Sequence, residues 1–480
     1  MTVMANQTAT DQVKESDMSI ALEIAKKACA IRYETLPPEA VHWAKIGILD
    51  TVAVTILGSR DNSTRMVEQI TDFDSSGPSL LFGFDRGTDP LTAALVNGTA
   101  AHALDFDDCN NTFCGHPSVP ILPGLFALAD QVGATGRDFI AAYVAGFETE
   151  CKISMGVNLH QYVKGWHPTV TVGIFGGAVA AAHLMRLTEE QTATALAIAT
   201  SMAAGIKSNL GTMTKPLHVG NCARNALFAA MLARQGFTAN PMAFEHKHGY
   251  FNVFNGEGNF DIARILPHWA DPLDIVSPGI AVKQYPCCAS THPAIDAMLE
   301  LISEHGLTPE NVEKIESYTH SRRLEHTNRP DPVSSVDAKF SVYYAVSRAL
   351  VEKRVVAEHF EGDAYLDPKV RSIMARMTAT PYTTAQFPAE NHFGAELRVT
   401  LKDGTLLTKK VDQPHGRTSA NPLSTAQLRE KFDNCVQDII HNDNIEPLYQ
   451  AIQRFENLAD TRLMTTLISS RKMATRDMAA

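Results

Sequence analysis

The stretch TKPLHVGNCARNALFAAMLARQG, residues 214–236, decides the fold class of this chain. Its part from Asn221 to Arg234 places alanine and other apolar residues on nearly every face of a helix, and Gly236 ends the pattern. A helix that is apolar all round is buried among other elements and does not lie on a surface. The stretch therefore predicts an internal helix of a large helical domain.

The same apolar, alanine-rich helical pattern recurs through the first half of the chain. Helices are predicted over 37–52, 89–103 and 138–147, and another begins at the capping box of Thr188 and Gln191. The small residues at 173–177 follow no predicted strand, so they favour close helix packing over dinucleotide binding. Residues 18–277 are therefore expected to form most of an all-α domain, behind a disordered tail at 1–17.

From residue 278 the pattern changes. One strand is predicted over 312–319, and a hairpin over 396–411 turns at Asp403-Gly404, a dipeptide favoured in tight β-turns. With helices predicted at 293–305, 338–351 and 366–377, residues 278–411 indicate a smaller α+β domain. Helical character returns over 423–470, and we expect 412–480 to pack on the first domain. The predicted fold is mainly α, a large all-α helical domain with an inserted smaller α+β lid domain.

Composition limits the possible partners. Hydrophobic residues make up 45% of the 480 residues and charged residues 20%, which is typical of a globular enzyme with more than one domain. The net charge of −11 argues against nucleic acid or an anionic membrane as a partner. The N-terminus has no apolar signal core, no uncharged apolar run is long enough to span a membrane, and the eight cysteines are scattered. We therefore expect a cytoplasmic enzyme.

A histidine directly precedes a proline at three places, His116, His167 and His292, and an apolar stretch follows each pair. Proline disfavours helical geometry in the residue before it and is itself favoured at the first helical position. Each histidine is therefore predicted at the mouth of a helix, where unpaired N–H groups favour an anion. Three such starts, if gathered together, predict a pocket for a small, multiply charged acid.

Three carboxylates crowd into four residues shortly before His116. Asp105, Asp107 and Asp108 cannot all be buried and charged without partners. They suit acid–base chemistry or structural pairing, in which they cap helix starts and pair with lysines, and ligation of a divalent cation is the less favoured alternative. A zinc site built on Cys109 and His116 is disfavoured because the spacing supplies no close cysteine pair. No nucleotide-binding or HExxH motif is present, and we predict neither a metal nor a cofactor.

Positive charge gathers at two further motifs. Lys215 and His218 precede the apolar helix quoted above, and Lys215 is expected to be held extended by the proline that follows it. Lys283 comes shortly before Cys288 and His292, where the smaller domain begins and could close over a site on the larger one. Such residues suit a carboxylate clamp. The alternatives are a solvated basic turn at the first motif and core packing at the second.

Taken together these clusters resemble the MmgE/PrpD family. The resemblance covers nearly the whole chain, from about residue 20 to 470, and four separate motifs match in the same order. They are Leu104-Asp105-Phe106-Asp107-Asp108 with His116-Pro117-Ser118, then Trp166-His167-Pro168, then Thr214-Lys215-Pro216-Leu217-His218-Val219-Gly220-Asn221, and then Tyr285-Pro286-Cys287-Cys288 with His292.

The resemblance implies a large all-α domain, a smaller lid and a cleft between them, usually in a homodimer. It also implies cofactor-independent chemistry on small di- and tricarboxylates. Reactions of the family include decarboxylation of cis-aconitate, dehydration of 2-methylcitrate and epimerisation of iminodisuccinate. The second and third motifs look more like the decarboxylase and epimerase branches. Two positions depart from the decarboxylase pattern, since Cys109 stands where threonine is expected and Cys288 where histidine is expected.

Carried over residue by residue, the resemblance also implies the site. The expected set is Asp105, His116, His167, Lys215, Lys283 and Tyr344, and His218, Cys109, Cys288 and His292 are expected to bind substrate beside them. His116 is the expected general acid or base and His167 the second proton carrier. The two lysines form an electrostatic clamp, Asp105 raises the pKa of a neighbouring lysine or histidine, and Tyr344 donates a hydrogen bond.

Three functions remain open at this stage. The first is a lyase acting on an acid like cis-aconitate. The second is an epimerase of an aminodicarboxylate, in which two histidines serve opposite faces of one carbon. The third is a scaffold that has lost the reaction, and the intact set of ionisable residues argues against it because unused buried charge costs stability.

Overall fold

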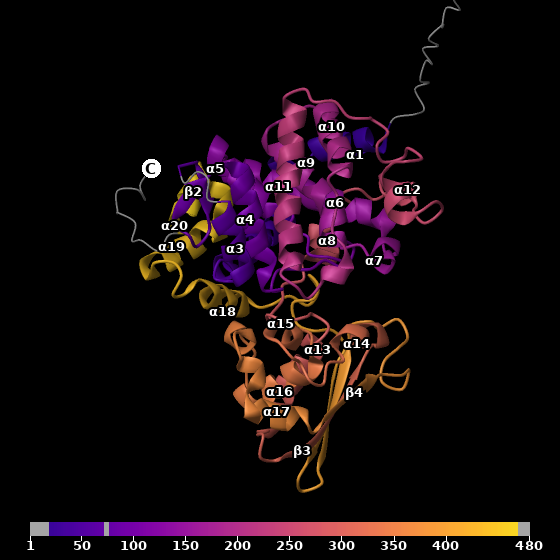
Figure 1. Cartoon of the computed structure of the whole chain (residues 1–480), viewed down its shortest axis with the longest axis vertical. Coiled ribbons are helices and arrows are strands. Elements are labelled where there is room, and N and C mark those ends of the chain that lie inside the picture. The colour runs from indigo at the N-terminus through magenta and orange to yellow at the C-terminus, as the bar shows by residue number, and fades with distance from the viewer. Residues whose placement is uncertain (1–18, 72–75, 469–480) are drawn as a thin grey trace, which may run out of the picture.

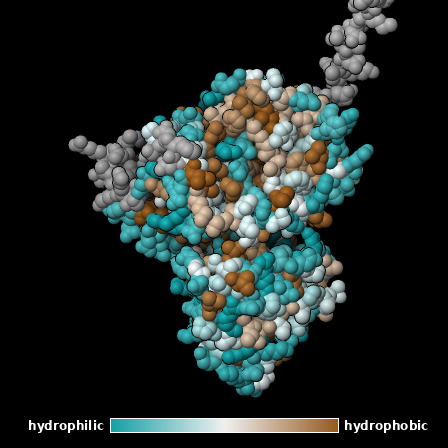
Figure 2. Space-filling model, in the orientation of Figure 1, coloured by the Kyte–Doolittle hydropathy of each residue, from teal (hydrophilic) through white to brown (hydrophobic). Residues whose placement is uncertain are grey.

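Two hydrophobic cores organise the chain in the computed structural model, which describes residues 19–71 and 76–468. The first core takes buried side chains from residues 20–282 and again from 423–468, and the second takes them from 285–411. Figure 1 shows the corresponding upper and lower bodies, and in Figure 2 the surface narrows where they meet. The tail predicted at 1–17 and the last two residues of the helical prediction lie outside the described residues.

Helices form nearly all of the first body, as predicted. The N-terminal helices are α1 (Ile20–Cys29), α2 (Pro38–Gly58), α3 (Asn62–Ile70), α4 (Pro90–Ala103), α5 (Leu122–Val132), α6 (Gly136–Val157), α7 (His160–Lys164), α8 (Pro168–Thr171), α9 (Gly173–Leu184), α10 (Glu189–Thr200), α11 (Thr214–Arg234) and α12 (Tyr250–Asn255). The C-terminal helices α18 (Thr425–Val436), α19 (Asn442–Gln453) and α20 (Arg462–Leu467) contribute to the same core. A two-stranded ribbon that the pattern did not reveal, β1 (Ser79–Leu81) with β2 (Arg86–Thr88), packs on α5.

Helix α11 is the internal helix that the opening stretch predicts, and it packs between α4 and α9. Its close approach to α4 depends on Gly220, because a Cβ there would lie 2.3 Å from the Leu95 carbonyl oxygen. The prediction of an extended Lys215 is wrong. Lys215 and Pro216 lie in the first turn of α11, where proline is tolerated because the N–H it lacks has no helical partner.

The three His-Pro pairs differ in their local structure. His167 is extended and precedes α8, as predicted. His292 is instead the first residue of α13 (His292–His305), and Pro293 follows inside the first turn. The prediction is wrong for His116, because a turn separates it from the next helix, which begins only at Leu122. A helix N-terminus is therefore not the feature that the three histidines share.

Helix α2 has the length and apolar composition of a membrane span. However, 78% of its apolar window is buried inside the protein, as in the core helix of a globular fold.

The capping box predicted at Thr188 and Gln191 opens α10 as expected.

The second body is an α+β unit. Its helices are α13 (His292–His305), α14 (Ser321–Thr327), α15 (Ser335–Lys339), α16 (Val342–Glu352) and α17 (Pro368–Met374), and its strands are β3 (Val312–Thr319), β4 (Met377–Pro381), β5 (Ala395–Leu401) and β6 (Leu406–Val411). The strand order is β4-β3-β5-β6. The predicted strand 312–319 and the β5–β6 hairpin are confirmed.

One helix prediction in this body is wrong at its end. The helix expected over 366–377 stops at Met374, and Met377 begins β4, which pairs in parallel with β3. Helical and strand patterns are hard to separate in so short a segment, and the partner strand lies far away in the sequence. The mainly α class of the whole chain is confirmed.

Candidate active site

The carboxylate cluster lies in the turn that follows α4. Asp105 takes a left-handed backbone conformation there, with φ of 53°. Lys431 on α18 holds the next residue, since its Nζ donates to the Phe106 carbonyl oxygen over 2.8 Å and lies 3.9 Å from the centre of the Phe106 ring. Lys431 also pairs with buried Asp50 on α2. The C-terminal helices thus position the turn that carries Asp105 and Asp107.

The three carboxylates have three different environments. Asp105 faces lysines, Asp107 faces histidines, and Asp108 accepts a hydrogen bond from the Ser118 hydroxyl. Burial and the nearby carboxylate of Asp50 raise the pKa of Asp108 well above its usual range, so the charged form of Asp108 is disfavoured. The predicted pairing of these carboxylates with cationic partners is present for Asp105 and Asp107, and their part in acid–base chemistry stays a prediction.

Asp107 joins two histidines. Its Oδ2 lies 2.8 Å from Nδ1 of His102 and 3.0 Å from Nδ1 of His116. Although burial works in the opposite direction, the two histidines hold the pKa of Asp107 well below its usual range. This buried carboxylate is therefore charged and orients both rings.

His116 is charged at neutral pH. Burial opposes its charged form, but Asp107 raises the pKa of the His116 imidazole to about 10. Since Nδ1 faces Asp107, Nε2 is the nitrogen directed elsewhere, and it lies 3.6 Å from Oδ1 of Asp105. His116 can therefore deliver a proton from Nε2.

His167 has the opposite charge state to His116. It is buried, and burial together with His102 lowers its pKa well below 6.5. Its ring stacks at 5.7 Å from the His102 ring, and its Nδ1 lies 3.4 Å from Nδ1 of His218. His167 is therefore neutral at pH 7 and can accept a proton. Two groups with pKa values displaced in opposite directions are the usual mark of an acid and base pair.

Asp105 anchors the cationic side of the cluster. Its Oδ1 accepts hydrogen bonds from Lys215 Nζ at 2.7 Å and from Lys283 Nζ at 3.0 Å, and its carbonyl oxygen accepts a second one from Lys283 at 2.6 Å. Burial works against the charge on Lys283, but Asp105 raises its pKa above the usual value. The predicted effect of Asp105 on a neighbouring lysine is confirmed. One carboxylate between two ammonium groups leaves net positive charge for an anionic ligand.

The two cysteines that depart from the decarboxylase pattern have unusual environments. Cys109 Sγ lies 3.9 Å from His116 Nδ1. Burial opposes thiolate formation, but His116 and Lys283 lower the pKa of Cys109 to about 7. Burial likewise opposes ionisation of Cys288, and a hydrogen bond with His326 lowers its pKa to about 7. Cys109 therefore lies at the cluster. The charge of Lys283 also contributes to the lowered pKa of Cys288.

Two predicted residues direct their hydrogen bonds into the second body, although the charge of Lys283 also acts on His292. Tyr344 on α16 belongs to the second core, where its hydroxyl donates to the His359 carbonyl oxygen and accepts from Arg348 Nε at 2.9 Å. This hydroxyl is engaged, so the structure does not support it as a donor to substrate. His292 is buried against Tyr285, with Nε2 3.3 Å from the Cys287 carbonyl oxygen, and burial lowers its pKa to about 3.

Two further residues of this region were not predicted from the sequence. His102 lies in the last turn of α4, three positions before Asp105, and that helical position was the available signal. Lys339 ends α15 and is buried, and its carbonyl oxygen accepts a hydrogen bond from the Cys288 amide. Burial lowers the pKa of Lys339, and the Lys339 ammonium pairs with no acidic side chain in the ranges that the structure describes. No local pattern marked Lys339.

His102, Asp107 and His116 also satisfy the distances of a metal site, since one ligand atom from each lies within 4.8 Å of the others. However, Oδ2 of Asp107 lies at hydrogen-bond distance from both imidazoles, which is the geometry of a proton-sharing cluster. The predicted absence of a metal stays a prediction.

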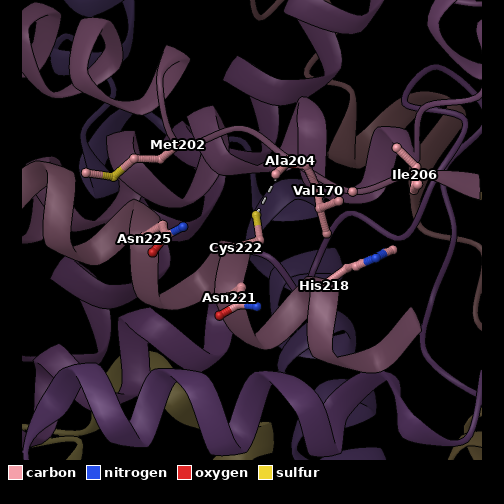
Figure 3. Close-up of a pocket in the computed structure, with 9 residues that line it drawn as sticks. Val170, Met202, Ala204, Ile206, His218, Asn221, Cys222 and Asn225 are labelled. Carbon is pink, nitrogen blue, oxygen red and sulfur yellow. Dashed lines mark hydrogen bonds between the residues drawn. The ribbon is translucent and has the colours of Figure 1, made fainter. Parts of the chain in front are cut away.

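A cavity of about 260 Å³ lies beside the cluster. Figure 3 shows Val170, Met202 and Ala204 around it, together with Cys222 and the polar side chains of α11. His218 lines this cavity, and its ring reaches His167. Polar groups from α11 therefore connect the cavity to the neutral histidine.

Two protein-family models match this chain and account for the four motifs that form the site. The MmgE/PrpD N-terminal domain matches residues 22–263, and the MmgE/PrpD C-terminal domain matches residues 285–455. The chain belongs to the MmgE/PrpD family. The family predicted from the four motifs is therefore confirmed.

Curated relatives cover most of the chain. Cis-aconitate decarboxylase from Homo sapiens is 30% identical over 461 residues, which are 94% of this chain and 94% of that protein. Cis-aconitate decarboxylase from Aspergillus terreus is 24% identical over 493 residues, 97% of this chain and 98% of that protein. The mitochondrial 2-methylcitrate dehydratase of Yarrowia lipolytica is 25% identical over 393 residues, 77% of this chain and 74% of that protein. The activities named in these relatives are lyase reactions.

Proposed function

We propose that this protein is a cofactor-independent lyase that acts on a small di- or tricarboxylate, with cis-aconitate decarboxylation as the reaction. The observation that carries the proposal is the opposite charge state of two histidines whose rings both lie beside His102, charged His116 and neutral His167, next to the Lys215–Asp105–Lys283 group. The named activities of the relatives support the choice of substrate.

The chemistry follows from these charges. When an allylic tricarboxylate loses CO2, the carbon–carbon bond to the leaving group breaks and its electron pair moves through the double bond. Negative charge then builds on a carbon next to a remaining carboxylate, as in an enediolate. The two lysines stabilise this charge in a buried site, and His116 Nε2 delivers the proton that the carbon needs.

The same site supports a second candidate, proton abstraction next to a carboxylate, as in dehydration or epimerisation. The observation that favours it is His167, because a neutral imidazole can accept a proton that a charged one cannot. The dehydratase relative is consistent with this reading. Decarboxylation needs only the charged donor, whereas these reactions need both histidines.

We also propose the remaining features of the architecture. Residues 278–411 act as a lid domain inserted between 18–277 and 412–480, and the enzyme works as a cytoplasmic homodimer. The separate hydrophobic cores support the division into domains. Analytical ultracentrifugation of the purified chain tests the oligomeric state, and a monomer at micromolar concentration contradicts it.

One experiment separates the reactions. The purified enzyme is incubated in D2O with cis-aconitate, 2-methylcitrate and iminodisuccinate in turn, and products are followed by NMR. We expect CO2 release from cis-aconitate and deuterium in the product. Loss of water from 2-methylcitrate places the enzyme with the dehydratases, and exchange at one α-carbon without bond cleavage makes it an epimerase. No reaction with any of the three substrates refutes the proposal.

A further inference from the structure

Two arginines near the active site lack acidic partners. Arg323 on α14 and Arg417, between β6 and α18, both lie against the ring of Phe393, with guanidinium carbons 4.5 and 4.4 Å from the ring centre. Neither forms an ion pair with an Asp or Glu anywhere in residues 19–71 or 76–468, whereas many other arginines of this chain do. Two positive charges around one aromatic ring repel each other unless an anion lies between them.

One N–H donor of this arginine pair has no acceptor among the described residues. Arg323 donates to the His392 carbonyl oxygen and, over 3.3 Å, to the Ser290 hydroxyl. Arg417 Nε is fully buried and has no hydrogen-bond partner among the described residues. A buried guanidinium N–H without an acceptor costs stability, so its retention indicates an acceptor that the described residues do not supply.

The pair adjoins the catalytic cluster. Gly416 brings its neighbour Arg417 against the segment that contains Lys283, since a Cβ on Gly416 would lie 2.4 Å from the Val282 carbonyl oxygen. One residue before Val282, Ala281 forms a β-bridge with Cys109, whose thiol contacts His116. Arg417 therefore lies on the Cys109 side of His116.

The electrostatics agree with this placement. Burial and the charge of Arg417 lower the pKa of the Arg323 guanidinium to about 10, and burial lowers that of Arg417. The groups that face the pair include the thiols of Cys109, Cys114 and Cys288, the phenol of Tyr382, His326 and the exposed Arg322, and none of these is a carboxylate. Cys109 and Cys288, with pKa values of about 7, supply only part of a negative charge at neutral pH, so the field at this end of the site stays positive.

We propose that Arg323 and Arg417 form a second anion subsite, which binds a carboxylate of the substrate that takes no part in bond breaking. The proposal rests on the proposed function for the identity of the substrate class. The Lys215–Lys283 group and the arginine pair would then hold different carboxylates of one molecule. Such a site selects tricarboxylates over shorter acids, because the two carboxylates of a shorter acid are held at the lysines and histidines and only a third carboxylate reaches the arginines, which bind it through parallel hydrogen bonds.

The test uses binding of an unreactive tricarboxylate, propane-1,2,3-tricarboxylate, by isothermal titration calorimetry, with glutarate as the dicarboxylate probe. We expect Arg417→Met and Arg323→Met to raise the Kd of the tricarboxylate about 10- to 100-fold and to leave the Kd of glutarate within threefold. Arg417→Lys should fall between wild type and Arg417→Met. The matched control is Arg322→Met, which removes the same charge from the exposed neighbour of Arg323 and should change neither Kd.

Each outcome has a distinct meaning when thermal melting shows that the variants fold. Equal tricarboxylate affinity in wild type and Arg417→Met overturns the subsite, as does an equal loss in Arg322→Met or no binding to wild type. Selective weakening together with no turnover of cis-aconitate supports the subsite and refutes the proposed function. Selective weakening together with turnover supports both.

Discussion

The charge on His116 depends on one buried carboxylate, and this dependence can be tested by Asp107→Asn. The substitution keeps the shape of the side chain but removes the charge that lies 3.0 Å from His116 Nδ1. Asp107 is the largest influence that raises the His116 pKa from 6.5 to about 10. A displacement of that size corresponds to about 5 kcal/mol between the two protonation states.

The expected loss of activity follows from the charged fraction. With the pKa returned to about 6.5, only about 3% of His116 is protonated at pH 8, so kcat falls roughly 30-fold there and only about fourfold at pH 7. Burial, which disfavours the imidazolium, makes the loss larger. The assay is kcat for cis-aconitate from pH 5.5 to 10.5, together with NMR titration of the His116 ring.

The sign of the pH dependence is determined by the raised pKa. In wild type, the stabilisation from the His116–Asp107 pair is fully present below pH 6.5 and is lost as pH rises through about 10, so kcat and the free energy of unfolding both decline over that range. In Asp107→Asn the decline in kcat should begin near pH 6. An alkaline limb that stays near pH 10 in this variant refutes the assignment of His116 as the charged proton donor.

Asp108→Asn is the matched control. Asp108 follows Asp107 directly and is equally buried, but burial raises its pKa, whereas the two histidines hold the pKa of Asp107 well below its usual range. Its carboxyl accepts a hydrogen bond from Ser118 and is not the carboxylate that lies beside His116, so we expect the alkaline limb of kcat in Asp108→Asn to stay where it is in wild type. Equal displacement of that limb in both variants would point to a general structural effect.

Four further results are expected. His167→Gln should lower any dehydration or proton-exchange activity by about 10²- to 10⁴-fold while propane-1,2,3-tricarboxylate still binds, and retained exchange would remove His167 from the base role. Lys215→Met should raise the KM for cis-aconitate about 10- to 100-fold, because one charge-assisted hydrogen bond is lost, and an unchanged KM would exclude Lys215 from binding. Tyr344→Phe should leave kcat unchanged but lower the free energy of unfolding in urea by about 1 to 3 kcal/mol, since its hydroxyl makes two internal hydrogen bonds, and a large loss of kcat would restore it to the site. Dialysis against EDTA should leave kcat unchanged, and a loss restored by Zn²⁺ would identify His102, Asp107 and His116 as metal ligands.

Several elements were predictable because their signals are local. The apolar helix 214–236, the capping box of α10 and the hairpin at Asp403-Gly404 each depend on residues a few positions apart, and each is present in the structure. The limits of local signals appear at β4, whose partner β3 lies more than fifty residues earlier, and at Lys215, where helix formation outweighs the usual effect of a following proline. The turn after His116 likewise had no distinct local pattern.

The sequence by itself determined which acids, bases and cations were available and that most of them stood in motifs of one family. Only the tertiary structure decided their pairing: Asp107 with His102 and His116, Asp105 with two lysines, and Tyr344 with the backbone of its own core. It also decided that His116 is charged and His167 neutral, and that Arg323 and Arg417 share one ring. The physical reason is that a pKa depends on burial and on charges within a few ångströms. Some of those neighbours, such as Asp107, lie in the same turn, but the burial and the lysines come from segments far apart in the chain.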